Sequence, residues 1–230
     1  MSDVPALVTL HVWRVPGRKV PTALGRMATD RGRARRTPGV AFAKLLGTGT
    51  GRTFTVRDSD PTRWAALTTW SSAAAADRYD VADRWDRIAS ESWRLDLRPL
   101  ASRGRWSGRE PFGRPASCRA DGSVVAITRA RLATRKAAAF WRAVPPVSAA
   151  LHRSPGLLAA IGIGEAPIGL QGTVSLWRSA ADLRAFAHQG AEHVAAVRRT
   201  SLEGWYAEEL FARFAVLGSS GTLDGRDPLA

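Results

Sequence analysis

Cysteine is nearly absent from this sequence: the 230 residues include one, Cys118. A single cysteine excludes an internal disulfide and any zinc or iron–sulfur site built from several cysteines. Long apolar runs are absent as well, and none reaches the ~18 residues that cross a bilayer. The first ten residues lack the basic and then apolar pattern of a signal peptide. We therefore expect a cytoplasmic protein without a transmembrane segment.

Lysine is also scarce, although the chain is strongly basic. Of its 34 basic residues only Lys19, Lys44 and Lys136 are lysines, and the formal net charge is +14. The arginines are scattered, with one dense group at residues 31–36 that contains no aromatic side chain for base stacking. This distribution indicates compositional bias, and no nucleic acid is expected as a partner. A basic surface would instead attract an acidic redox protein.

Two parts of the chain repeat each other. Pro38-Gly39-Val40 recurs as Pro155-Gly156-Leu157, and the same spacing relates Gly47 to Gly164. Trp70 recurs as Trp177 at a spacing about ten residues shorter, so the first copy has a longer loop at residues 47–61. The constant order of these matches predicts an internal duplication.

Each copy has the pattern strand–helix–strand–strand–helix–strand. In the first, we predict strands at residues 7–15, 40–46, 64–70 and 93–100, with helices at 21–35 and 73–89. In the second, we predict strands at 123–131, 157–163, 171–177 and 205–217, with helices at 134–143 and 180–199. Residues 1–102 and 123–217 are thus two halves, joined by a Gly-, Pro- and Arg-rich linker at 103–122 and followed by a disordered tail at 218–230. The fold class is α+β: two ferredoxin-like βαββαβ repeats that pack as a dimeric α/β barrel.

Alternation along the first strand of each half indicates which side chains share a face. Val8, Leu10 and Val12 form an apolar face that we assign to the helices, which leaves His11 on the barrel side. In the second half, Arg129 and Arg131 share one face of the strand with Val125 and Ile127.

The chain has four histidines, and they are the candidate metal ligands. His188 and His193 lie in the predicted helix 180–199 about 140° apart, so they cannot face one metal ion. On a helical wheel His188 is opposite the apolar stripe, whereas His193 is at its edge, beneath Phe186 and between Gln189 and Ala196. Small neighbours leave room there for a flat group, although an ordinary core histidine fits the same position. His11 is the main competitor, His152 suits a capping or surface role, and Cys118 is an incidental linker cysteine.

Several stretches resemble the spheroidene monooxygenase family, the haem-containing acyclic carotenoid 2-ketolases and their relatives. The resemblance covers about residues 40–217 and is most specific in the second half. The stretches are Leu45-Leu-Gly-Thr-Gly49, Trp106-Ser-Gly-Arg-Glu-Pro-Phe112, Ala126-Ile-Thr-Arg-Ala130, Phe140-Trp-Arg-Ala-Val-Pro145, Pro155-Gly-Leu157, Ile161-Gly-Ile-Gly-Glu-Ala-Pro167, His193-x-x-Ala196-x-x-x-Thr200 and Trp205-Tyr-Ala-Glu-Glu-Leu-Phe-Ala-Arg-Phe214.

The resemblance implies haem b, activation of O2 with electrons from a ferredoxin-type donor, and an apolar carotenoid-like or specialised-metabolite substrate. The family reaction hydroxylates one carbon twice, and the geminal diol loses water to give a ketone. His193 matches the family's histidine and is thereby the candidate iron ligand, with Phe186, Gln189 and Ala196 beside the cofactor. Arg129 and Arg131 are the candidate catalytic residues, because arginine pairs with haem propionates or polarises bound oxygen.

Other functions stay open at this point. Related barrels carry haem for aldoxime dehydration or peroxidase-like chemistry, bind haem without catalysis, or oxygenate without a cofactor, and fold does not decide among them. A homo-oligomer and a peripheral association with a membrane also stay open.

Overall fold

The computed structural model describes residues 3–52, 58–116, 120–132, 146, 148–165, 170–189 and 206–230. Its first half contains β1 (Leu7–Arg14), a 3-10 turn (Gly17–Lys19), α1 (Val20–Arg36), β2 (Val40–Gly49), β3 (Ser59–Trp70), α2 (Ala73–Ala76), α3 (Asp80–Asp86) and β4 (Glu91–Gly104). The second half contains β5 (Val124–Leu132), β6 (Leu157–Gly164), β7 (Leu170–Trp177), α5 (Ala180–Gln189) and β8 (Tyr206–Gly221).

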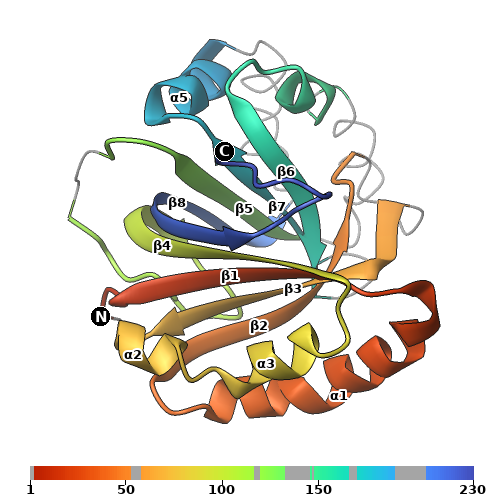
Figure 1. Cartoon of the computed structure of the whole chain (residues 1–230). Coiled ribbons are helices and arrows are strands. Elements are labelled where there is room, and N and C mark those ends of the chain that lie inside the picture. The colour runs from red at the N-terminus through yellow and green to blue at the C-terminus, as the bar shows by residue number, and fades with distance from the viewer. Residues whose placement is uncertain are drawn as a thin grey trace.

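The strands close into one antiparallel barrel in the order β1-β3-β2-β6-β7-β5-β8-β4. Helices α1, α2 and α3 cover one side of the barrel and α5 lies on the opposite side (Figure 1). The two halves meet where β2 pairs with β6 and where β4 pairs with β8. The predicted fold class, two ferredoxin-like units in one α/β barrel, is confirmed.

Some element boundaries differ from the predictions. The long loop is shorter than expected, because β2 continues to Gly49 and β3 begins at Ser59. The single helix predicted at 73–89 is two short helices, since the chain turns between Ala76 and Asp80. The helix predicted at 134–143 lies outside the described residues, and the helix predicted at 180–199 is described as far as Gln189.

The strand registers show that the two halves repeat. Leu7 pairs with Trp70 in the first half, and Val124 pairs with Trp177 in the second. The β2–β3 ladder is irregular between Val40 and Phe42, and the β6–β7 ladder is irregular at the equivalent place, between Leu157 and Ala159. Trp70 and Trp177 therefore occupy equivalent positions, as the repeat predicted.

Both faces of β1 are buried, and our assignment of the two faces was reversed. Val8, Leu10 and Val12 belong to the apolar interior of the barrel. Trp13 packs in the layer beneath α1, α2 and α3, and His11 is stacked on its ring on the same side of the strand. The alternation of β1 cannot tell the two faces apart, because the barrel interior and the helix layer both demand apolar side chains.

Residues 104–112 of the predicted linker and residues 221–229 of the predicted disordered tail form ordered segments of the same kind. We call residues 104–112 the first capping loop and residues 221–229 the second. In each, a β-bridge closes a tight turn, Trp106 with Arg109 and Leu223 with Arg226. Each turn has two residues with positive φ: Ser107 and Gly108 in the first (53° and 73°), Asp224 and Gly225 in the second (56° and 78°).

The capping loops insert apolar side chains into the barrel interior. Trp106, Phe112 and Leu223 are buried in the interior cluster, and Leu229 packs against it. A composition rich in glycine, proline and charge suggested a solvated chain, but these few apolar anchors give both segments a buried attachment. The expectation of a disordered tail at residues 218–230 is thereby corrected.

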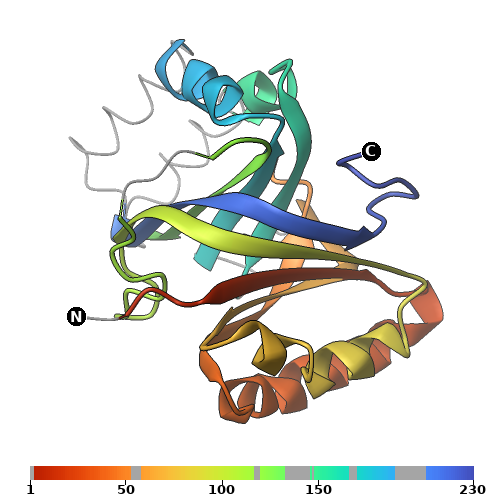
Figure 2. The same ribbon diagram turned by 60° about the vertical axis from the view of Figure 1, so that its left-hand side comes forward.

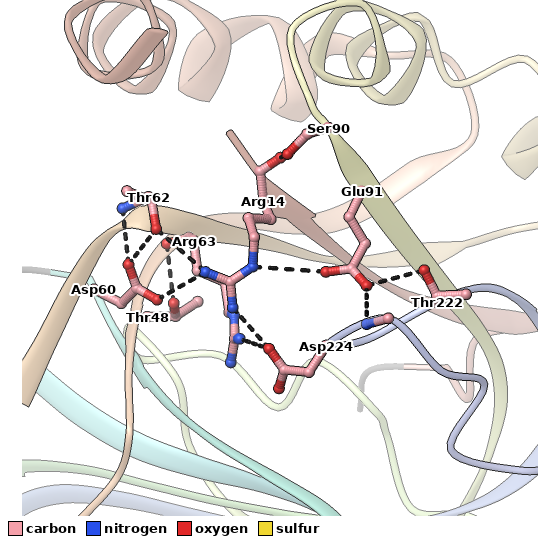
Figure 3. A network of polar contacts seen from close by, with 10 residues as sticks. Arg14, Thr48, Asp60, Thr62, Arg63, Ser90, Glu91, Thr222 and Asp224 are labelled. Carbon is pink, nitrogen blue, oxygen red and sulfur yellow. Dashed lines mark hydrogen bonds and ion pairs between the residues drawn. The ribbon is translucent and has the colours of Figure 1, made fainter. Parts of the chain in front are cut away.

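Each capping loop is held by the opposite half of the chain. Glu208, at the start of β8, accepts hydrogen bonds from the backbone N–H groups of Ser107 and Gly108 at 3.0 and 2.7 Å. Glu91, at the start of β4, accepts hydrogen bonds from Thr222 Oγ1 at 2.9 Å and from the N–H of Gly225 at 2.6 Å. Arg14 joins Glu91 and Asp224 in the second network (Figure 3). In Figure 2 the second loop, near the C-terminus, lies at the opposite end of the barrel from the N-terminus.

We predict that Leu223→Ala lowers the free energy of unfolding by roughly 2–5 kcal/mol, because it removes a leucine from the barrel interior and leaves a cavity. Urea unfolding of the full chain measures the change. Leu217→Ala is the matched control: Leu217 is 56% exposed on β8, and its loss should cost about 0.5 kcal/mol or less. Equal effects of the two substitutions would mean that the second capping loop contributes no core.

Candidate functional site

The sheet face that looks toward the helices differs greatly between the two halves. The registers make Thr128 the equivalent of His11, Ala130 the equivalent of Trp13, and Gln171 the equivalent of Trp64. In each pair the second half carries the smaller side chain. The second-half sheet therefore presents a nearly flat face where the first half presents large rings.

On the first-half face, large rings pack between the sheet and the helices. Trp13 stacks on Trp85 of α3 with ring centroids 5.3 Å apart, and Trp64 lies 6.0 Å from the same ring. Thr9, Ala43 and Ala66 are buried beneath these rings and the helices. No ligand of porphyrin size fits in this layer.

The second-half face is only partly covered: of the three equivalent positions, Ala130 and Gln171 are buried. Thr128 is exposed, and Ala126, Ala160 and Thr173 are half-buried, although their counterparts in the first half are buried. We call this surface the small-residue face and define it by Ala126, Thr128, Ala130, Ala160 and Thr173. Its side chains are small, and all of them except Ala130 are partly accessible.

Helix α5 borders the small-residue face. Its Phe186 packs on Trp177 with ring centroids 5.2 Å apart, and Leu183 contacts the same cluster. Of the predicted cofactor-binding residues, Phe186 is thus placed at this face, and Gln189 is the last described residue of α5. His193 and Ala196 lie outside the described residues, and their roles stay predictions.

The barrel interior is a poor alternative site. It is filled by apolar side chains from all eight strands and by the anchors of both capping loops. Interiors packed in this way leave few voids larger than a water molecule. Of the two regions, the small-residue face is the less completely buried.

Arg129 occupies the interior side of β5, away from α5, within a cluster of charges. Its Nη1 donates a hydrogen bond to Glu208, and its Nη2 donates one to Glu165 at 2.9 Å. Trp106 Nε1 donates to Glu165 at 2.7 Å, and its ring lies 5.6 Å from the Arg129 guanidinium. Lys44 Nζ donates to Glu165 and to Ser107 Oγ. Two cations and two carboxylates balance one another here.

Hydrogen bonds keep both carboxylates ionised despite their burial. Burial alone would raise the pKa of Glu165, but hydrogen bonds from Lys44 and Trp106 and the Lys44 charge outweigh it and lower that pKa. Burial alone would also raise the pKa of Glu208. Hydrogen bonds from the N–H groups of Gly108 and Ser107 and from Arg129 outweigh burial, so the pKa of Glu208 is lowered. Both carboxylates therefore stay negatively charged near neutral pH.

Of the two predicted catalytic arginines, Arg129 belongs to this cluster and Arg131 does not. Arg129 is 3% exposed and bound to two carboxylates, whereas Arg131 is exposed near the end of the same strand. Their catalytic roles stay predictions. Sequence reasoning missed Lys44, Glu165 and Glu208, although a signal existed: Lys44 interrupts an apolar strand, and four of the stretches that carry the family resemblance supply Trp106, Arg129, Glu165 and Glu208.

The described histidines do not form a metal site. His11 does not face the barrel interior, contrary to our expectation, and its stacking on Trp13 at 5.4 Å places it in the helix layer of the first half. Burial and the nearby charge of Arg94 lower the pKa of His11 to about 3. His152 is exposed, with Nδ1 2.8 Å from the carbonyl oxygen of Ser148, and Cys118 lies outside the described residues. The part of the chain that is described contains no group of three His, Cys, Asp or Glu side chains suited to a metal ion.

None of the described helices combines the length and the apolar character needed to cross a membrane.

No protein-family model matches the chain. Among individual proteins, spheroidene monooxygenase of Rhodobacter capsulatus is 38% identical over 231 residues, which cover 97% of this chain and 95% of the relative. Spheroidene monooxygenase of Cereibacter sphaeroides is 34% identical, covering 96% of this chain and 70% of the relative. Among solved structures, aldoxime dehydratase OxdRE in complex with butyraldoxime matches 91% of this chain and 79% of its own with a TM-score of 0.60. At 12% identity, that likeness is one of fold.

We predict that Arg129→Met destabilises the protein by roughly 3–5 kcal/mol, because Glu165 and Glu208 would stay buried with one cation fewer. Arg131→Met, on the same strand but exposed, should change the free energy of unfolding by about 0.5 kcal/mol or less. Urea unfolding of both variants measures the difference. A small decrease in the free energy of unfolding of Arg129→Met would show that the cluster tolerates unbalanced charge.

Proposed function

Because the chain belongs to the spheroidene monooxygenase family, and is thereby a monooxygenase, we propose that it uses haem b to oxygenate an apolar, carotenoid-like substrate. The family supplies the reaction class. The cofactor and the substrate are the proposal, and they rest on the residues of the second half.

The small-residue face is the observation that carries the haem proposal. A porphyrin is flat and largely apolar, so it needs a broad surface without protruding side chains. The replacement of His11, Trp13 and Trp64 by Thr128, Ala130 and Gln171 gives the second half such a surface. The half-buried Ala126, Ala160 and Thr173 lie beside these positions, and a bound porphyrin would cover them.

His193 is the proposed iron ligand, with Phe186, Gln189 and Ala196 around it. Phe186 and Trp177 form an apolar wall at the border of the face, which would exclude water from one side of the ring. The described histidines suit the role less: His11 lies in the filled first-half layer, and His152 is exposed. When bound, haem supplies the activation of O2, and the protein supplies position and a dry environment.

The relatives' names support a carotenoid as the substrate class, because spheroidene is what those enzymes are named for. Sequence identity also favours oxygenation over aldoxime dehydration. The oxygenases are 34–38% identical over almost the whole chain, whereas the dehydratase is 12% identical and shares the fold. A fold alone does not fix the reaction.

We predict that Thr128→Trp abolishes haem binding while the protein stays folded. The substitution places a ring on an exposed position of the small-residue face, so it obstructs the ligand without entering the core. Thr22→Trp, at an exposed position of α1 in the first half, is the control and should keep the Soret band. Both proteins are purified after expression with haem supplied, and circular dichroism checks their folding.

His193→Ala and His11→Ala, prepared in the same way, identify the ligand. Loss of the Soret band in His193→Ala alone is the expected result. A folded His193→Ala protein with an unchanged Soret band and unchanged activity would contradict the ligand assignment. A normal Soret band in Thr128→Trp would contradict the location of the haem.

We also propose an acidic ferredoxin-type protein as the electron donor, because the chain carries a net charge of +14. Attraction of this kind weakens with salt, since the screening length falls to about 8 Å at 0.15 M. The rate of electron transfer from a reduced ferredoxin, measured by stopped flow, should therefore fall several-fold between 20 and 300 mM salt, on the order expected for steered association. A rate independent of ionic strength would mean that the basic charge has no part in docking.

A further inference from the structure

The small-residue face continues past β5 onto β8 and β4. Residues that lie directly opposite each other in an antiparallel pair of strands project from the same side of the sheet. Phe211 of β8 is opposite Thr128, and Arg213 of β8 is opposite Ala126. Arg103 of β4 is in turn opposite Phe211. The β8 and β4 margin of the face therefore carries two arginines beside one aromatic ring.

Another border of the same face is apolar. There Phe186 of α5 packs on Trp177, and Leu183 contacts the same cluster. A flat ligand on this face would meet an apolar wall on one side and two guanidinium groups on another. The arrangement suits a ligand that is apolar over most of its plane and carries its anionic groups at one edge.

The two arginines are available to such a ligand. Both are exposed, and neither has an ion-pair partner among the residues that the structure describes. The Arg103 guanidinium lies over the Phe211 ring, 4.6 Å from its centroid, and a guanidinium stacked in this way keeps its N–H groups for other acceptors. Glu209, opposite Ala130, adds one negative charge to the margin, which therefore stays positive. Arg129, on the other side of β5, already has two carboxylate partners.

The chemistry of this margin distinguishes the proposed cofactor from the proposed substrate. Haem is apolar over most of its plane and carries both of its propionates at one edge. A carotenoid-like chain has no carboxylate to pair with a guanidinium. Arginine binds carboxylates through parallel, charge-assisted hydrogen bonds, so two exposed arginines at one margin favour haem as the occupant of the face.

We propose that Arg213 and Arg103 bind the propionates of haem at the small-residue face. The inference rests on the proposed haem function and adds the residues that orient the cofactor. Arg129 and Arg131 alternate with Thr128 along β5 and so project from the other side of the sheet. Propionate binding therefore falls to the arginines of β8 and β4.

The test compares haem with haem dimethyl ester, in which both propionates are esterified and uncharged. Each is titrated into the haem-free, full-length protein, and the Soret band measures binding. Arg213→Gln and Arg103→Gln should each weaken haem binding about fivefold, as expected for a charge pair that is open to solvent, and should leave ester binding unchanged. Arg35→Gln removes the same charge at an exposed position of α1 in the first half, and it should change neither affinity.

The haem-loaded proteins give a second readout. In resonance Raman spectra, the propionate bending band should move in Arg213→Gln and Arg103→Gln, whereas the iron–histidine band of the ferrous protein should not. Circular dichroism checks that the variants are folded.

The outcomes separate this inference from the haem proposal. If the wild-type protein binds haem and neither arginine substitution changes the ratio of haem affinity to ester affinity, the arginine assignment alone is overturned. Equal weakening of haem and ester would also overturn it, because the arginines would then act on the protein and not on the propionates. A wild-type protein that binds neither porphyrin would overturn the haem proposal and this inference with it.

Discussion

The exchange of capping loops between the two halves is the constraint on which the architecture depends. Glu208 of the second half holds the turn at Ser107 and Gly108, and Glu91 of the first half holds the turn at Thr222 and Gly225. With both turns held in this way, the barrel interior is filled by Trp106, Phe112 and Leu223. Neither half therefore completes its own core, and the closed barrel is a joint product of both.

The layer between the sheet and the helices differs between the two halves. Since the interior is filled, a large ligand can lie only between the sheet and the helices. In the first half, rings such as Trp13, Trp64 and Trp85 occupy that layer. In the second half, the same positions carry small residues. The two halves share one arrangement of strands, and they differ in the size of the side chains on the face toward the helices.

The sequence allowed the succession of strands along each half, the duplication and the equivalence of Trp70 and Trp177 to be predicted, because these depend on local alternation and on spacing. It did not reveal which face of β1 meets the helices, because both faces are buried. The capping loops were misinterpreted because glycine, proline and charge dominate their composition. A comparison of the two would have helped: Gly104, Gly108, Arg109 and Pro111 recur as Gly221, Gly225, Arg226 and Pro228. The charged cluster around Arg129 needed the fold, because its members come from distant segments.

The internal duplication has a further consequence for symmetry. A homodimer of one such half would carry identical residues at both helix-facing sheets, and any substitution would change both at once. Fusion into a single chain removes that coupling, so Thr128 and His11 occupy equivalent places with unrelated side chains. The chain thereby behaves as a heterodimer encoded in one sequence. Its proposed cofactor stoichiometry is one per chain, with the other half acting as scaffold.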